Sequence, residues 1–328
     1  MNATTANLCR RRFMGSGAAL ALSGRAAWGQ GSSKPLEIIV GYGPGGGTDL
    51  LARLIGIPLA KTAGRPVVVK NVPGAGGQIA ASALLREGGD GLSVMAMNHP
   101  DLYMAVERGN AGFKISDFQV IMVDMVDPRV FLVKNGSDMA SFADFVARAK
   151  AQPGQLAVSV AAGSAQEAYA KWLFSSLLGL DVTVVGYKGG AEASNALLAG
   201  DVAATIGDDF ARFNLRQQVK ALFIGAARKS PRWPEAPTLA SILGPMRVSM
   251  PSPDFMARYG IYVVPSAFKA RNPAGYAALQ KALLQARASA EFQDYFNKNN
   301  LQDLSIGKPG EGFDAVFAAD MVEIRKVK

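Results

Sequence analysis

Two glycine-rich segments constrain this chain more than any other feature of its sequence. The first covers residues 41–49 and follows the β-rich run 36–40; the second covers 73–78 and follows the run 67–69. Apolar residues take on helical spacing directly after each segment. Glycine lets the backbone approach a ligand closely, and the free N–H groups at the start of a helix attract anions. Two such helix starts facing one cleft predict an anion site built from backbone, although each segment alone also fits a plain tight turn.

The rest of the chain alternates short β-rich runs with longer amphipathic ones. We expect strands at 36–40, 67–69, 92–97, 120–123, 156–160, 182–185, 202–206, 221–224 and 260–264. We expect helices at 49–59, 79–85, 141–151, 165–178, 192–199, 272–288 and 291–299, with Pro58 ending the first. Such alternation predicts an α/β protein whose parallel sheets carry helices on both faces. The run 249–254 contains two prolines and predicts a linker between two α/β units.

The first glycine segment also fits a second function. Gly41, Gly43 and Gly46 have the spacing of a dinucleotide-binding fingerprint between a strand and a helix. A nicotinamide site would place an acidic residue at the end of the next strand, and Lys70-Asn71 stands there instead. An NAD(P)-dependent oxidoreductase using this loop therefore stays an alternative to an anion-binding protein.

A single histidine and a single cysteine limit the chemistry that the chain can carry. Cys9 cannot form an intramolecular disulfide, and His99 with Cys9 cannot build a zinc site of several such ligands. A catalytic His–Cys pair would have only these two candidates. We expect no metal and no cofactor. The basic residues Arg228, Lys229 and Arg232 lack interleaved aromatic residues, so they predict a solvated loop and no nucleic-acid partner.

Residues 1–29 have the three-part layout of an export signal. Basic residues at 10–12 precede an uncharged, Ala- and Leu-rich stretch, and small residues precede Gln30. The Arg-Arg-x-Phe-Met order is typical of a twin-arginine signal, and a Sec signal remains the alternative. Removal of 1–29 takes away Cys9 and four arginines, so the net charge falls from +9 to +9 − 4 = +5. No later run of apolar residues is long enough to predict a membrane span.

Five motifs carry a resemblance to a known family. They are the Tyr-x-Pro-Gly-Gly-Gly-Thr-Asp run at 42–49, the Val-rich strand with Pro-Gly-Ala-Gly-Gly at 67–77, Ala-Lys-x-x-Pro-Gly at 149–154, Tyr-Lys-Gly at 187–189, and the run from Arg228-Lys229-Ser230-Pro231 to Pro237-Thr238. In this order and spacing the chain resembles the substrate-binding proteins of tripartite tricarboxylate transporters, the Bug (Bordetella uptake gene) family. The resemblance covers the chain from about residue 36 to its end.

The resemblance implies the type II periplasmic binding protein fold, a Venus flytrap of two α/β lobes, each with a mainly parallel sheet and flanking helices. Lobe 1 is expected at 34–128 plus 252–328, and lobe 2 at 129–251. The resemblance implies a monomeric periplasmic receptor, not an enzyme, that captures a small organic carboxylate between its lobes. Its partners would be membrane transporter subunits or a sensor protein. The identity of the carboxylate, and the choice between transport and sensing, stay open.

The same resemblance implies the ligand-binding residues. In the first lobe they are Tyr42, Gly45, Gly46, Gly47, Thr48, Asp49, Gly74, Ala75, Gly76 and Gly77. In the second lobe they are Ser159, Gly163, Ser164, Gln166, Tyr187 and Asp208. The glycine loops would hold a carboxylate through backbone amides and water. Asp49 would meet a ligand amine or hydroxyl, or serve only to cap the helix.

Three positions depart from the family pattern. Glu167 stands where a histidine is common, Asp209 where asparagine is usual, and Gly41 in place of a proline. Glu167 is expected either to repel an anionic ligand or to accept a hydrogen bond from an amine or hydroxyl. Among the remaining residues, we expect His99 on a surface loop, despite its place after a strand, and Trp172 and Phe174 in the core.

Overall fold

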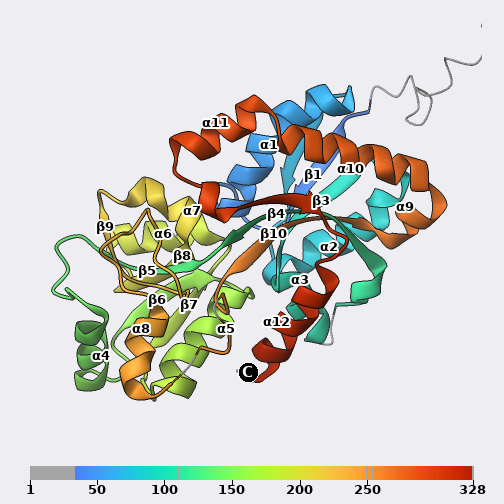
Figure 1. Cartoon of the computed structure of the whole chain (residues 1–328). Helices are drawn as coiled ribbons and strands as arrows, with labels where there is room; N and C mark the ends of the chain where they lie inside the picture. The colour runs from blue at the N-terminus through green and yellow to red at the C-terminus, as the bar shows by residue number, and fades with distance from the viewer. Residues whose placement is uncertain (1–33, 109–110, 249, 253, 327–328) are drawn as a thin grey trace, which may run out of the picture. The chain divides into compact units, whose positions relative to one another are not determined.

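The computed structural model describes residues 34–108, 111–248, 250–252 and 254–326. The predicted export signal at 1–29, with Cys9, lies outside the described residues. Two separate sheets organise residues 34–326 (Figure 1). In the described part of the chain, no helix combines the length and apolarity that a membrane span requires.

The first sheet has six strands in the order β11–β4–β10–β3–β1–β2. Their bounds are β1 (Leu36–Val40), β2 (Val67–Asn71), β3 (Ser93–His99), β4 (Phe118–Asp127), β10 (Arg258–Pro265) and β11 (Ser305–Pro309). β1 runs parallel to β2 and β3, whereas β10 is antiparallel to β3 and β4, and β11 is antiparallel to β4.

The second sheet has five strands in the order β7–β6–β8–β5–β9. Their bounds are β5 (Arg129–Lys134), β6 (Ala157–Ala161), β7 (Thr183–Tyr187), β8 (Ala204–Asp208) and β9 (Val219–Ile224). β6 is parallel to β7 and β8, and β5 is antiparallel to β8 and β9. The expectation of mainly parallel sheets is therefore wrong, and both sheets are mixed. The antiparallel pairs involve β11 and the two strands that follow a passage of the chain from one sheet to the other, β5 and β10.

Helices flank both faces of the first sheet. They are α1 (Gly47–Ala63), α2 (Gln78–Glu87), α3 (Asp101–Glu107), α9 (Ser266–Arg271), α10 (Pro273–Arg287), α11 (Ala290–Lys298) and α12 (Asp314–Lys326). α1 packs against α10 on one side, and α2 and α3 lie on the other (Figure 1). Pro58 does not end α1, contrary to expectation: the helix continues to Ala63 because its buried face, including Ile55 and Leu59, packs against the sheet and α10, which outweighs one lost hydrogen bond.

The second sheet also carries helices on both faces. They are α4 (Phe142–Ala151), α5 (Ala165–Lys171), α6 (Gly190–Ala199), α7 (Asp209–Arg212) and α8 (Leu239–Leu243). One core cluster joins α4, α5 and α8 to the sheet, with Phe145 of α4 packed edge-to-face on Phe131 of β5, and a second joins α6 to the opposite face. The helix expected at 165–178 changes to π-helical turns at Trp172–Leu177. Trp172 and Phe174 are buried in the core, which confirms that expectation.

Two expectations about polar side chains are wrong. His99 is the last residue of β3 and is 0% exposed, with its ring stacked on Phe317 at 4.1 Å between centroids. A strand end covered by α12 is not a surface loop, which explains the error. Arg232 is also buried rather than solvated, because Asp209 and Asp303 pair with its guanidinium.

Candidate ligand-binding site

The first glycine loop folds back on Asp49. Gly46 is the N-cap of α1, and the Gly45 N–H donates to Oδ2 of Asp49 at 2.8 Å. Arg53 and Asn71 donate to the same carboxylate, at 3.0 and 2.8 Å. Burial raises the pKa of Asp49, but these hydrogen bonds outweigh burial and lower it overall. Asp49 therefore stays ionised, and its protein partners leave little of the carboxylate for a ligand amine.

The second glycine loop has a backbone that only glycine adopts easily. Gly74, Gly76 and Gly77 have φ values of 138°, 63° and 93°, and the 3-10 turn η1 (Ala75–Gly77) leads directly into α2. A Cβ placed on Gly76 would overlap the carbonyl oxygen of Gly163. The close approach of these two backbones thus depends on the absence of a side chain at Gly76.

The two glycine loops touch different parts of the second sheet's loops. The Gly43 N–H donates to the Lys188 carbonyl at 3.4 Å. A Cβ on Gly47 would lie 2.8 Å from Oδ2 of Asp208 and 2.9 Å from Nη2 of Arg258. The structure therefore brings Gly47 to Asp208, and Gly76 to Gly163, as pairs of expected site residues from separate sheets.

Tyr42 and Thr48 belong to a buried polar network at this junction. The Tyr42 hydroxyl donates to Oδ2 of Asp101, whose Oδ1 accepts the Ala165 N–H at 2.7 Å. Burial and the Asp101 carboxylate raise the pKa of Tyr42 well above its usual value. Thr48 donates to Oδ1 of Asn98 at 3.1 Å. Asp101 thereby links the first sheet to the start of α5, a role that the sequence did not indicate.

Several of the expected site residues of the second lobe already form hydrogen bonds with other groups of this chain. Ser159 is buried and donates to the Ala193 carbonyl of α6 at 2.7 Å. Ser164 caps α5. Gln166 donates to Oδ1 of Asp208 at 3.1 Å. Tyr187 ends β7, where it is partly buried against the α6 face.

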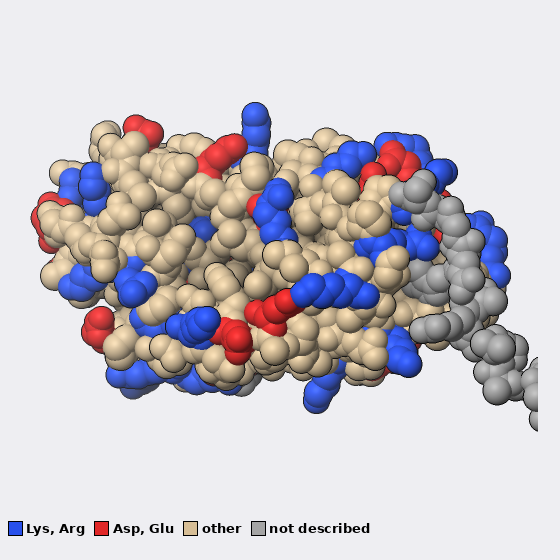
Figure 2. All heavy atoms as spheres, turned by 90° about the horizontal axis from the view of Figure 1, so that it is seen from above, with Lys and Arg blue, Asp and Glu red and all other residues tan. Residues whose placement is uncertain are grey.

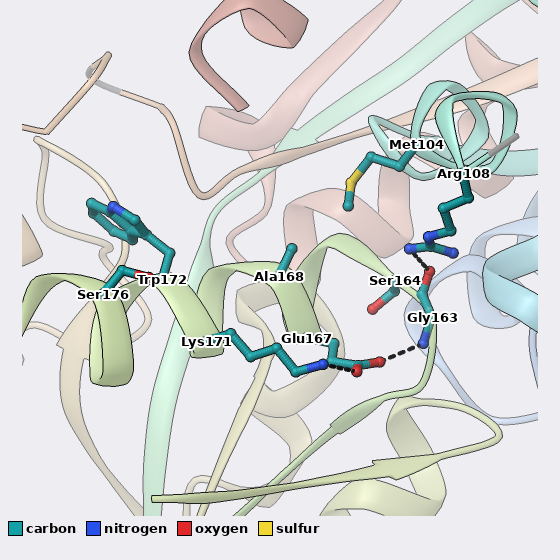
Figure 3. A pocket seen from close by; sticks show the side chains of 9 residues that line it. All are labelled: Met104, Arg108, Gly163, Ser164, Glu167, Ala168, Lys171, Trp172 and Ser176. Atoms are coloured by element: carbon teal, nitrogen blue, oxygen red, sulfur yellow. Dashed lines mark hydrogen bonds and ion pairs between the residues drawn. The ribbon is translucent and has the colours of Figure 1, made fainter. Parts of the chain in front are cut away.

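Gly163 lies at the edge of a hollow of about 440 Å³ between α3 and α5 (Figure 3). Its N–H donates to Glu167 at 2.8 Å and its carbonyl accepts Arg108 at 2.6 Å. Glu167 also pairs with Lys171 at 2.6 Å. The Glu167 carboxylate is therefore held by this chain's own groups. This role differs from both of the roles expected for Glu167, which involved a ligand.

Three buried arginines at the junction were missed by sequence reasoning: Arg129 on β5, Arg212 at the end of α7 and Arg258 on β10. The signal for two of them was present, because Arg129 and Arg258 each adjoin an apolar strand run. The outer surface is different: on the face seen in Figure 2, the Lys and Arg side chains are scattered over the surface, with Asp and Glu among them. Buried cations, unlike these, need a specific partner.

The fold and this junction define the class of protein: two helix-flanked α/β lobes that meet at glycine-rich helix starts, as in two-lobed solute-binding proteins. Residues 51–301 match the tripartite tricarboxylate transporter family receptor, and the chain belongs to that family. Protein BugT of Bordetella pertussis is 31% identical over 226 residues, which cover 67% of this chain and 69% of BugT. A UPF0065 protein from the tcbD–tcbE intergenic region of Pseudomonas sp. (strain P51) is 26% identical over 73% of each chain.

Solved structures share the fold. The periplasmic binding protein BugD superposes with a TM-score of 0.76 at 22% identity, over 89% of this chain and 94% of BugD. MatC from Rhodopseudomonas palustris with bound malate gives 0.73 at 24% identity, over 89% and 97%. The R. palustris protein Rpa4515 with adipate gives 0.76 at 22% identity, over 90% and 96%.

Members of this family are receptors, and this chain is a binding protein rather than an enzyme. The alternative of an NAD(P)-dependent oxidoreductase is therefore wrong. Where such an enzyme has an acidic residue for the ribose, β2 ends in Asn71. The Asn71 amide instead donates to the Tyr42 carbonyl at 3.0 Å and to Asp49, and so supports the first glycine loop.

Proposed function

We propose that this receptor captures a small organic carboxylate between its two lobes and delivers it to a tripartite tricarboxylate-type transporter or to a sensor protein. The observation that carries the proposal is the convergence of two glycine-rich helix starts on the junction of the two sheets. The unpaired N–H groups at the start of α1 favour an anion there. Malate in MatC and adipate in Rpa4515 indicate the chemical class of solute.

The binding residues that we propose are drawn from those expected from the sequence. The backbones at Gly45–Gly47 and Gly74–Gly77 would hold the carboxylate, with Thr48, Gln166, Tyr187 and Asp208 completing the pocket around the rest of the solute. Ser159 and Ser164 would act indirectly, because their hydroxyls already hold α6 and α5 in place.

Lobe movement is the proposed mechanism. We keep the lobe limits of 34–128 plus 252–328 and 129–251; the separation of β1–β4, β10 and β11 from β5–β9 supports them. A solute that contacts both lobes would shift the population from an open to a closed arrangement. We also propose that residues 1–29 direct export and that the mature receptor works in the periplasm as a monomer.

Native mass spectrometry of the freshly purified protein, followed by calorimetry, tests the proposal. The acids for calorimetry are acetate, succinate, malate, adipate, citrate and benzoate. We expect at least one to bind, with a stoichiometry of one per chain. No binding by any acid, together with no co-purified anion, would contradict a carboxylate receptor. Deletion that abolishes carboxylate-induced gene expression but leaves uptake unchanged would favour the sensor partner.

A further inference from the structure

Arg212 is a buried cation without a partner. Its side chain lies inside the junction of the two sheets, and the residue is 2% exposed. Its Nε and Nη2 have no hydrogen-bond partner, and no carboxylate of the described residues lies within ion-pair distance of the guanidinium. Burial lowers the pKa of Arg212 to about 10, with Asp127 opposing and Arg258 adding to the shift, so the group is still charged at neutral pH.

The two neighbouring arginines differ from Arg212. Arg258 donates to Asn98 at 2.9 Å and to Asp127 at 2.8 Å. Arg129 pairs through Nη1 with Asp208, although its Nε and Nη2 are also unpartnered. A buried charge that lacks a partner is strongly unfavourable, so the arrangement at Arg212 is complete only with an anion.

The guanidinium of Arg212 lies against the first residue of α6. A Cβ on Gly190 would overlap Nη2 of Arg212, and a Cβ on Gly207 would lie 2.7 Å from its Nε. The start of α1 is also close, because a Cβ on Gly46 would lie 3.8 Å from the Gly190 nitrogen. The N-terminal ends of two helices, α1 with 17 residues and α6 with 10, therefore approach the unpaired guanidinium from separate lobes.

The unpartnered atoms of Arg212 have a specific chemistry. Nε and Nη2 lie along one edge of the guanidinium, where two parallel N–H groups fit the two oxygens of one carboxylate. This chain uses the same edge elsewhere: Arg232 donates from Nε and Nη2 to the two oxygens of Asp209, at 2.9 and 2.6 Å.

We propose that the Nε–Nη2 edge of Arg212 binds a carboxylate of the solute between the N-terminal ends of α1 and α6. Arg212 is then the residue that makes the receptor specific for an ionised group at this position, in addition to the backbone amides of the glycine loops. This inference rests on the proposed carboxylate-binding function and adds to it a side-chain cation. It requires that an amide in place of the carboxylate be rejected, because an amide NH₂ group would face the guanidinium N–H groups.

The test compares Arg212→Gln and Arg212→Lys with the control Arg216→Gln, an exposed arginine four residues further along. The acid that the wild-type protein binds best, out of acetate, succinate, malate, adipate, citrate and benzoate, is titrated into all four proteins by calorimetry. Its amide, or monoamide for a diacid, is titrated beside it. Thermal unfolding without solute is recorded for each protein.

We expect Arg212→Gln to weaken binding of the acid by about 10- to 100-fold and to bring the affinities for acid and amide close together. Arg212→Lys should bind with intermediate affinity, because it keeps the charge and loses the paired geometry. Arg216→Gln should match the wild-type protein. Without solute, Arg212→Gln should unfold at the wild-type temperature or above, since it removes an unpaired buried charge.

Three outcomes would overturn the inference. Unchanged affinity and selectivity in Arg212→Gln would show that Arg212 does not contact the solute, while leaving the proposed function intact. Lower stability of Arg212→Gln without solute, with the preference for acid over amide retained, would show that Arg212 only supports the fold. Failure of the wild-type protein to bind any of the six acids would remove the proposed function, and this inference with it.

Discussion

Arg232 and Arg212 are both buried arginines near the junction of the two sheets, yet their surroundings are opposite. Arg232 has carboxylates on both sides, from Asp209 and Asp303. Burial lowers its pKa, but the hydrogen bonds that its guanidinium donates to these two carboxylates outweigh burial and raise it overall. Arg212 has no such partner, and burial lowers its pKa.

The difference in partners separates two roles of a buried arginine, one in stability and one in binding. The partners of Arg232 belong to the chain, so its charge is satisfied whether or not a solute is present, and it joins α7 to the segment before β11. The partner of Arg212 has to come from outside the chain. A structural arginine and a binding arginine can thus be distinguished by counting partners, since burial alone is nearly equal for the two.

The largest expected effect on stability comes from removing the ion pairs of Arg232. Arg232→Gln should lower the free energy of unfolding by about 3–5 kcal/mol, because it leaves the Asp209 carboxylate buried without its cation. Urea unfolding measures this loss. Arg228→Gln, an exposed arginine of the same loop, is the matched control and should change stability by less than about 0.5 kcal/mol. Equal effects in the two variants would remove the contrast between Arg232 and Arg212.

A second prediction concerns the contact between the second glycine loop and Gly163, which involves neither arginine. Gly76→Asp should abolish solute binding, with at least a 100-fold loss of affinity as a rough lower bound, because its side chain would overlap Gly163 and add a negative charge at the loop. Gly136→Asp is the control, since Gly136 has a similar φ of 81° and open space around it. Both variants carry a similar backbone strain of about 1 kcal/mol. Calorimetry with the best-binding acid should therefore separate them, and similar affinities in the two would show that the second loop does not govern binding.

The smallest expected effect on stability concerns His99, a buried side chain whose surroundings favour its neutral form. Burial lowers its pKa below 6.5, although Asp320 partly opposes the shift. The unfolded chain therefore takes up a proton first as the pH falls, and stability from this group is complete above pH 6.5 and decreases below it. We expect a loss of about 1 kcal/mol between pH 7.5 and 5.5 in urea unfolding. His99→Gln should remove this part of the pH dependence, and an unchanged slope would assign it to other groups.

The fold and the glycine loops could be predicted because their signals are local. The composition of the runs at 41–49 and 73–78 is enough to place each of them between a strand and a helix. The helix expected at 141–151 agrees with α4 to one residue. The mixed pairing of the sheets had no such signal. β10 forms after the chain returns from the other sheet, and it is antiparallel to its neighbours β3 and β4. These neighbours are distant in the sequence, so no local pattern predicts the direction of β10.

The partners of the buried charges could not be predicted for the same reason. Arg258 pairs with Asp127 across 131 positions, and Arg129 pairs with Asp208 across 79. No spacing rule connects residues so far apart. His99 illustrates the opposite error: we expected it on a surface loop, whereas the packing of α12 over the end of β3 buries it.

The contacts between the lobes through Gly43 and Gly76 have a mechanical consequence. Each is made by backbone atoms on both sides, with Lys188 and Gly163 as the opposite members. Backbone atoms cannot change rotamer, so in the proposed closure these contacts would act as a rigid stop. The distance between the closed lobes would then be the same for every solute, and a molecule too long for that distance would keep the lobes apart. The length of the solute would then be limited by these two backbone contacts, whatever side chains line the rest of the pocket.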